Sequence, residues 1–150
     1  MKSKEMLTFW LFLFSYSLTI FLSIQNYLKT KKLIPIFLIL LVVGLSLRLY
    51  TKKLLGKHFS INIIIHKDHK IIQNGIYKYI RHPMYLSNIL IFMSIPGFFS
   101  SYYGILSTII LIIPTTILRI EIEEKHLKHQ CKKEYQKYQQ RTSKLIPFIY

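Results

Sequence analysis

The chain has 150 residues, about half of them hydrophobic, yet it carries a formal net charge of +15. A basic charge of this size is common in proteins that bind nucleic acid, but those proteins gather Lys and Arg on one face. Here the charges lie between and after long apolar runs, which argues against a nucleic-acid partner and predicts one membrane domain with cationic loops.

The first apolar run covers residues 7–28 and follows Lys2 and Lys4. It is longer than the ~7–15-residue hydrophobic region of a signal peptide, and no small-residue cleavage site follows it. We therefore expect a retained transmembrane helix. The second run, residues 33–49, is just long enough to cross a bilayer if Arg48 and the flanking lysines extend toward the surface.

The third and fourth runs, residues 83–99 and 105–118, flank an uncharged turn and predict a tilted helical hairpin. Pro96-Gly97 is expected to break the third run. Residues 119–140 are charged and helix-prone, and their apolar side chains recur on one stripe, which predicts a basic helix at the membrane interface. The stripe consists of Ile120, Leu127, Cys131 and Tyr138. The expected fold is all-α and polytopic, with about four transmembrane helices.

Topology follows from the distribution of Lys and Arg. The segment 50–81 and the C-terminal tail are strongly basic, whereas the turn at 100–104 has no charge. The positive-inside rule places the basic segments, and with four spans both termini, in the cytoplasm. Lys29, Lys31 and Lys32 then lie on the opposite side, against the rule.

The first polar cluster precedes the third run. Gly75 follows Asn74 in a turn signal, and Pro83 suits the first position of a helix, which puts His82 beside the N-cap. Tyr77 and Tyr85 then lie at the membrane boundary, close to free backbone N–H groups that can bind a polar or anionic ligand. An aromatic belt with a solvated histidine is the simpler interpretation.

The second polar cluster follows the fourth run, where three of the six acidic residues fall within four positions. Acidic groups at the cytoplasmic boundary of a membrane are costly, because anionic headgroups repel them and because they lose water. Arg119 and Glu123 share one helix face. They are either a surface ion pair, worth ~0.3–0.5 kcal/mol, or ligand-binding residues. In the second case Glu123 would bind a cationic or hydroxyl-bearing cofactor and Arg119 an anionic substrate. No metal site is expected, because the sequence has neither HExxH nor CxxC.

The two clusters together resemble the isoprenylcysteine carboxyl methyltransferases and the related phospholipid methyltransferases. The resemblance covers residues 61–147, the expected catalytic region. It rests on H-x-[aliphatic]2-x2-G-x-Y, R-H-P-x-Y, R-x3-E-E-x2-L and a closing I-P, at His69 to Tyr77, Arg81 to Tyr85, Arg119 to Leu127 and Ile146-Pro147.

The resemblance implies S-adenosylmethionine as cofactor. It implies substrate binding by Arg119 and catalytic roles for Arg119, Glu123 and Glu124, without deciding which carboxylate matters more; Asn62 is a weaker candidate for an amide contact. The implied cofactor-binding residues are His69, Lys70, Ile71, Ile72, Tyr77, His82, Pro83, Met84, Tyr85 and Glu123.

The implied reaction is carboxyl O-methylation of a lipophilic, prenylated or lipid acceptor that enters from the bilayer. A carboxylate is already a nucleophile, so the enzyme aligns the reacting atoms and excludes water. One alternative is N-methylation of a phospholipid amine, which needs a base such as Glu124 or a histidine. Another is a non-enzymatic protein that binds anionic lipid, which explains the basic charge but not the acidic cluster.

Overall fold

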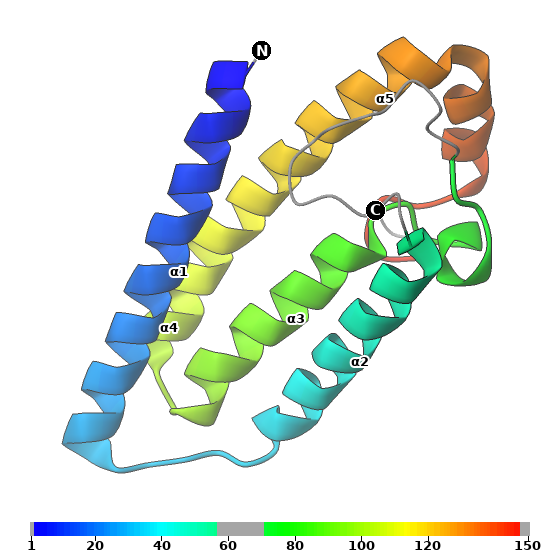
Figure 1. Ribbon diagram of the computed structural model, residues 1–150. Helices are drawn as coiled ribbons and strands as arrows, with labels where there is room; N and C mark the ends of the chain where they lie inside the picture. Colours follow the sequence, from blue (N-terminus) through cyan, green and yellow to red (C-terminus); the bar gives the residue numbers. More distant parts are fainter. Residues whose placement is uncertain (1, 57–70, 148–150) are drawn as a thin grey trace.

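The computed structural model describes residues 2–56 and 71–147 (Figure 1). Within these ranges the chain is helical apart from short connections and one parallel β-bridge between Ile80 and Ser143, so the expected all-α class is confirmed. The elements in order are α1 (Lys2–Thr30), α2 (Phe37–Leu55), the 3-10 helix η2 (Gly75–Lys78), α3 (Pro83–Phe98), α4 (Tyr102–Ser107), the π-helix η3 (Thr108–Ile112) and α5 (Ile113–Arg141).

The helices form an elongated bundle in which α2 packs on α3 and α1 packs on α4 (Figure 1). The α1–α2 and α3–α4 connections meet at one end, where the Asn26 side-chain amide donates to the carbonyl oxygens of Phe99 and Ser100, both at 3.0 Å. The N-terminus and the start of α3 lie toward the other end, where the charged part of α5 projects (Figure 1).

Two helical stretches are long and apolar enough to cross a membrane, Met6–Thr30 and Tyr102–Arg141. The second is 40 residues long, about twice what a bilayer needs, and its charged part from Arg119 onward lies beyond the apolar residues. Helix α3 is apolar but has only 16 residues, and α2 carries three cations in its second half. The apolar helices identify an integral membrane protein, while four spans remain a prediction.

Helix α3 continues through Pro96, so the expected break at this residue is wrong. A proline in a helix leaves the carbonyl four residues earlier without its N–H donor. The orphaned carbonyl is that of Phe92, and the Thr108 hydroxyl of η3 donates to it at 3.4 Å. A neighbouring helix therefore supplies the missing hydrogen bond, as is usual for prolines at membrane depth.

The basic segment 119–140 is helical as expected, but it is part of a longer helix, and its place at the membrane interface stays a prediction. Helix α5 runs on from the apolar residues without a break at Arg119, and the backbone turns only at Lys132, where φ is 38° and ψ is −117°. Beyond this kink the last turns of the helix fold back toward the start of α3 (Figure 1). Tyr135 and Tyr138, which lie after the kink, are consequently buried.

Candidate active site

The start of α3 is built as its sequence predicts. His82 is the N-cap residue and Pro83 occupies the first helical position, where its missing N–H has no intrahelical partner to lose. Gly75 has a φ of 55°, and a Cβ atom there would lie 2.6 Å from the hydroxyl oxygen of Tyr50 in α2. The predicted turn at Gly75 and the predicted helix start at His82 and Pro83 are confirmed, and the turn brings the segment before α3 close against α2.

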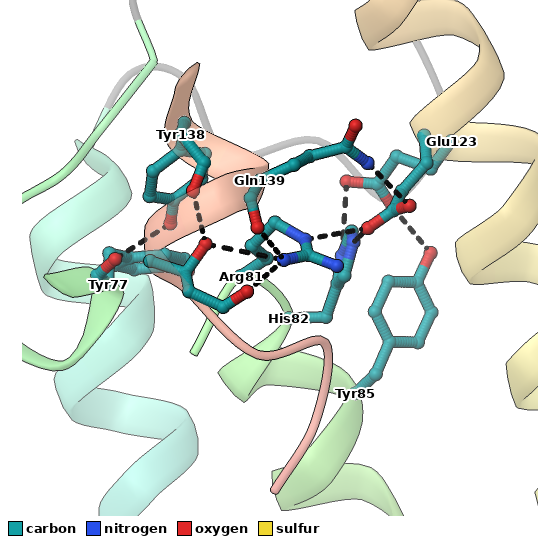
Figure 2. A network of polar contacts seen from close by, with 9 residues as sticks. Tyr77, Arg81, His82, Tyr85, Glu123, Tyr138 and Gln139 are labelled. Carbon is teal, nitrogen blue, oxygen red and sulfur yellow. Dashed lines mark hydrogen bonds and ion pairs between the residues drawn. The ribbon is translucent and has the colours of Figure 1, made fainter. Parts of the chain in front are cut away.

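A buried ion pair joins α3 to α5. Arg81 Nε donates to Glu124 Oε1 at 2.8 Å, and the two side chains are only 8% and 7% exposed. Arg81 Nη1 also donates to the carbonyl oxygens of Gln139, at 3.2 Å, and of Thr142. The Gln139 amide donates to Glu124 Oε2 at 2.9 Å (Figure 2). One guanidinium therefore connects the N-terminus of α3, the middle of α5 and the chain beyond the kink.

Glu124 accepts a third hydrogen bond from His82, whose Nε2 lies 3.1 Å from Oε1. Glu124 belongs to the charged part of α5, beyond the apolar residues. Burial alone would raise the pKa of its carboxyl group, but hydrogen bonds from His82 and Arg81 outweigh burial and lower the pKa to about 2. Glu124 is consequently ionised at physiological pH, and its oxygens are already engaged by three neighbours.

Glu123 differs from Glu124 in both exposure and partners. Its side chain is 30% exposed, and its Oε2 accepts a hydrogen bond of 2.8 Å from the Tyr85 hydroxyl (Figure 2). Its Oε1 lies 4.0 Å from His82 Nδ1. The charge of Arg119 also acts on the Tyr85 hydroxyl. The first turn of α3 and one face of α5 thus bring together a tyrosine, a histidine, a carboxylate and a guanidinium.

The C-terminal segment closes the cluster from a third direction. The backbone N–H groups of Arg81 and His82 donate to Ser143 and Lys144 at 2.9 and 3.0 Å, so residues 142–145 run beside the approach to α3. The Tyr138 hydroxyl donates to the Tyr77 carbonyl at 2.8 Å. Burial first, and then the negative charge of Glu123, raise the pKa of the Tyr77 hydroxyl.

Sequence reasoning missed several residues of this network. Gln139 and Thr142 had no assigned role, and nothing in the hydrophobic pattern marks them as partners of Arg81. The closing Ile146-Pro147 motif is a sequence signal that the C-terminal end belongs to the site. The network connects residues about 60 positions apart in the chain, and hydrophobic periodicity cannot predict contacts over that separation.

The remaining candidates are not all gathered at the cluster. The Met84 sulfur faces α2, where it lies 3.6 Å from Arg48 Nη1 and 3.7 Å from Thr51 Oγ1. Ile71 and Ile72 are half-buried in the segment before η2. His69, Lys70 and Asn62 lie outside the described residues.

Comparison with known proteins places these elements in a family. Residues 37–129, more than half of the chain, match the model of the isoprenylcysteine carboxyl methyltransferase (ICMT) family. The chain is also 28% identical over 151 aligned positions to the protein-S-isoprenylcysteine O-methyltransferase of Saccharomyces cerevisiae. That alignment covers 91% of this chain and 54% of the yeast protein, so the chain spans about half the length of this relative. The chain belongs to the isoprenylcysteine carboxyl methyltransferase family.

Proposed function

We propose that this protein transfers a methyl group from S-adenosylmethionine to the carboxylate of a lipophilic acceptor, of which a prenylated cysteine is the best candidate. The observation that carries the proposal is the meeting of Tyr85 and His82, at the start of α3, with Glu123 and Arg119 on α5. This meeting point lies where the apolar residues of α5 give way to charged ones. The acceptor class follows from the family and from the name of the yeast relative.

The donor set suits the cofactor. When bound, S-adenosylmethionine supplies a methyl group that its positive sulfur has activated. Glu123 is partly exposed, and its carboxylate can accept hydrogen bonds from hydroxyl or ammonium groups while the Tyr85 hydroxyl holds it in place. The ring of Tyr85 offers an aromatic surface to a cation. His69, Lys70, Ile71, Ile72 and Tyr77 would complete the site from the preceding segment, with Pro83 and Met84 at the start of α3.

The arrangement favours an acid over an amine as the methyl acceptor. A carboxylate needs no base, whereas an ammonium group must lose a proton before it attacks. Glu124 is a poor base, because Arg81, His82 and Gln139 all bind it and its pKa is about 2. In our proposal Arg119 would hold one carboxylate oxygen by a charge-assisted hydrogen bond and leave the other oxygen free to take the methyl group, with S-adenosylhomocysteine as the leaving group. Glu124 then acts as a positioning residue for His82 and Arg81.

We further propose a multi-pass topology with the site at the cytoplasmic surface. The site lies at the end of the bundle toward which the charged part of α5 and the segment 71–82 are directed (Figure 1). The positive-inside rule assigns strongly basic segments to the cytoplasm. The acceptor would enter laterally from the bilayer, since the site adjoins the apolar parts of α3 and α5.

Cofactor binding is the first test. Purified, detergent-solubilised protein should bind S-adenosylhomocysteine saturably in titration calorimetry, and Glu123→Ala should weaken that binding about tenfold or more, because a charge-assisted hydrogen bond is lost. Glu121→Ala is the matched control, since Glu121 is an exposed carboxylate on the same helix. Equal binding by both variants would remove Glu123 from the cofactor site. A folded wild-type protein that binds no cofactor would overturn the proposed function.

The chemistry of the product separates the two acceptor classes. With cofactor labelled in its methyl group, we expect label to enter an S-farnesylcysteine derivative and to be released as methanol by mild base, because esters hydrolyse and N-methyl amines do not. Phosphatidylethanolamine serves as the competing acceptor in a parallel assay. Base-stable label in that phospholipid would instead establish N-methylation.

A further inference from the structure

A cation in α2 contacts the side of α3 that faces α2, and none of its hydrogen bonds is with Tyr85 or Glu123. Arg48 is four residues before Lys52, and its side chain reaches Met84 and Asn88 of α3. Its Nη1 donates to the side-chain oxygen of Asn88 and lies 3.6 Å from the Met84 sulfur. The contact lies in the interface between α2 and α3 (the seam), where the helices pack so closely that a Cβ atom at Gly44 would lie 2.9 Å from Ile91 Cγ1.

The charge of Arg48 is not neutralised in the part of the chain that the structure describes. Asn88 and Met84 are both neutral, and no carboxylate of the described residues pairs with Arg48. A guanidinium has five N–H donors in a rigid fork. Only Nη1 is used within residues 2–56 and 71–147, so Nε and Nη2 have no protein acceptor there.

The position of Arg48 makes an unmatched charge costly. Helix α2 continues for seven residues to Leu55, a rise of about 10 Å. In the four-span topology predicted from the sequence, this places Arg48 inside a membrane helix, where arginines usually extend toward the surface. Arg48 is instead held in the seam by Asn88. Leu45 and Leu49, which flank it on the outer side of α2, are 44% and 68% exposed, so its surroundings on that side are apolar chains.

We propose that Arg48 and Asn88 form a binding site for the phosphate of an anionic phospholipid from the surrounding bilayer. The guanidinium fork matches two phosphate oxygens, and Asn88 fixes its orientation before the lipid binds. The acyl chains would lie along the exposed apolar stripe of α2 that continues away from Arg48, formed by Leu38, Val42 and Leu45. The site borders the proposed cofactor site at Met84, but it shares no hydrogen bond with Tyr85 or Glu123 and does not depend on the proposed methyl transfer.

The competing interpretation is an interhelical hydrogen bond that only stabilises the α2–α3 pair. The two interpretations differ in their dependence on lipid. A purely structural bond stabilises the protein to the same extent in any bilayer, whereas a phosphate site adds stability only when anionic phospholipid is present.

The test uses the full chain in nanodiscs of phosphatidylcholine with or without phosphatidylglycerol. Phosphatidylglycerol should raise the wild-type Tm and remain bound in native mass spectrometry, and Arg48→Gln should weaken its retention about tenfold, the loss expected for one charge-assisted contact. Lys53→Gln is the matched control, because it removes the same charge from an exposed position near the end of α2. Arg48→Lys keeps the charge without the fork and should also weaken retention, which preserves the test if Arg48→Gln fails to fold.

Three outcomes would overturn the proposal. The first is that Arg48→Gln lowers Tm equally in both lipid mixtures. The second is that Lys53→Gln weakens retention as much as the Arg48 variants do, which would reflect bulk charge rather than a site. The third is that inorganic phosphate, or the free acid of an S-farnesylcysteine derivative, stabilises the wild type through Arg48 while phosphatidylglycerol does not.

Discussion

Replacing Glu124 with alanine is expected to destabilise the protein by about 3–5 kcal/mol, the usual cost of removing one partner from a buried ion pair. Arg81 would keep its charge in a position where its side chain is only 8% exposed. His82 and Gln139 would lose an acceptor at the same time. Activity should then disappear because the site no longer assembles.

The effect should be greatest beyond the kink at Lys132. Residues 133–147 are joined to α3 largely through Arg81 and the backbone beside it, so loss of the ion pair should release this segment. Thermal unfolding in detergent measures the stability, and tryptic cleavage after Lys137 and Arg141 measures the release. Glu124→Gln, which keeps one carbonyl oxygen as acceptor, should fall between wild type and Glu124→Ala.

Glu121→Ala provides the control, because this exposed carboxylate has the same charge and lies one helical turn earlier. It should unfold and be cleaved like the wild type. Glu123→Ala should also keep its stability while losing cofactor binding, since Glu123 is partly exposed and contacts Tyr85 and His82 without belonging to the buried ion pair. A Glu124→Ala protein as stable as the wild type would contradict the structural role of the ion pair.

The sequence was sufficient for the features that depend on local chemistry. Long apolar runs predicted the helices, and the first run at 7–28 corresponds to α1 (Lys2–Thr30). Proline at a first helical position and glycine at a positive φ have local steric causes, so Pro83 and Gly75 were identified correctly. The resemblance likewise identified the family, because its motifs are short and ordered along the chain.

Features that depend on tertiary contacts could not be predicted from the sequence. The backbone turn at Lys132 has neither glycine nor proline to mark it, and its positive φ is unusual for a lysine. The helix through Pro96 persists because Thr108, twelve residues later, donates to the orphaned Phe92 carbonyl. The Met84 sulfur contacts Arg48 and Thr51, so the side chain faces α2. The R-H-P-x-Y motif contains no residue of α2 and could not predict this contact.

The sequence could not show which of Glu123 and Glu124 has which role, because this too depends on tertiary contacts. Both residues fit the motif, but one helical step of about 100° separates their directions. Glu124 points toward Arg81 and Gln139 and becomes buried, whereas Glu123 points toward Tyr85 and stays partly exposed. Their different surroundings predict different consequences of substitution, which the variants above measure.

Arg119→Ala is expected to lower kcat/KM for a carboxylate acceptor by about 100-fold, because one charge-assisted hydrogen bond to the substrate is worth roughly 1.5–3 kcal/mol. The affinity for S-adenosylhomocysteine should change little, since in our proposal Arg119 contacts the acceptor and Glu123 the cofactor. Steady-state methylation of an S-farnesylcysteine derivative, together with calorimetric cofactor binding, measures both quantities on the same sample.

Arg119→Lys separates charge from geometry. Lysine keeps the positive charge but loses the planar fork, so partial recovery of turnover would indicate that orientation of the carboxylate matters beyond attraction. Arg119 also acts on the Tyr85 hydroxyl, so an indirect effect through Glu123 must be distinguished. An indirect effect would weaken cofactor binding in Arg119→Ala and would be reproduced by Tyr85→Phe. Full turnover in Arg119→Ala would exclude both direct binding of the acceptor by Arg119 and an indirect effect through Glu123. Another cation would then have to hold the acceptor.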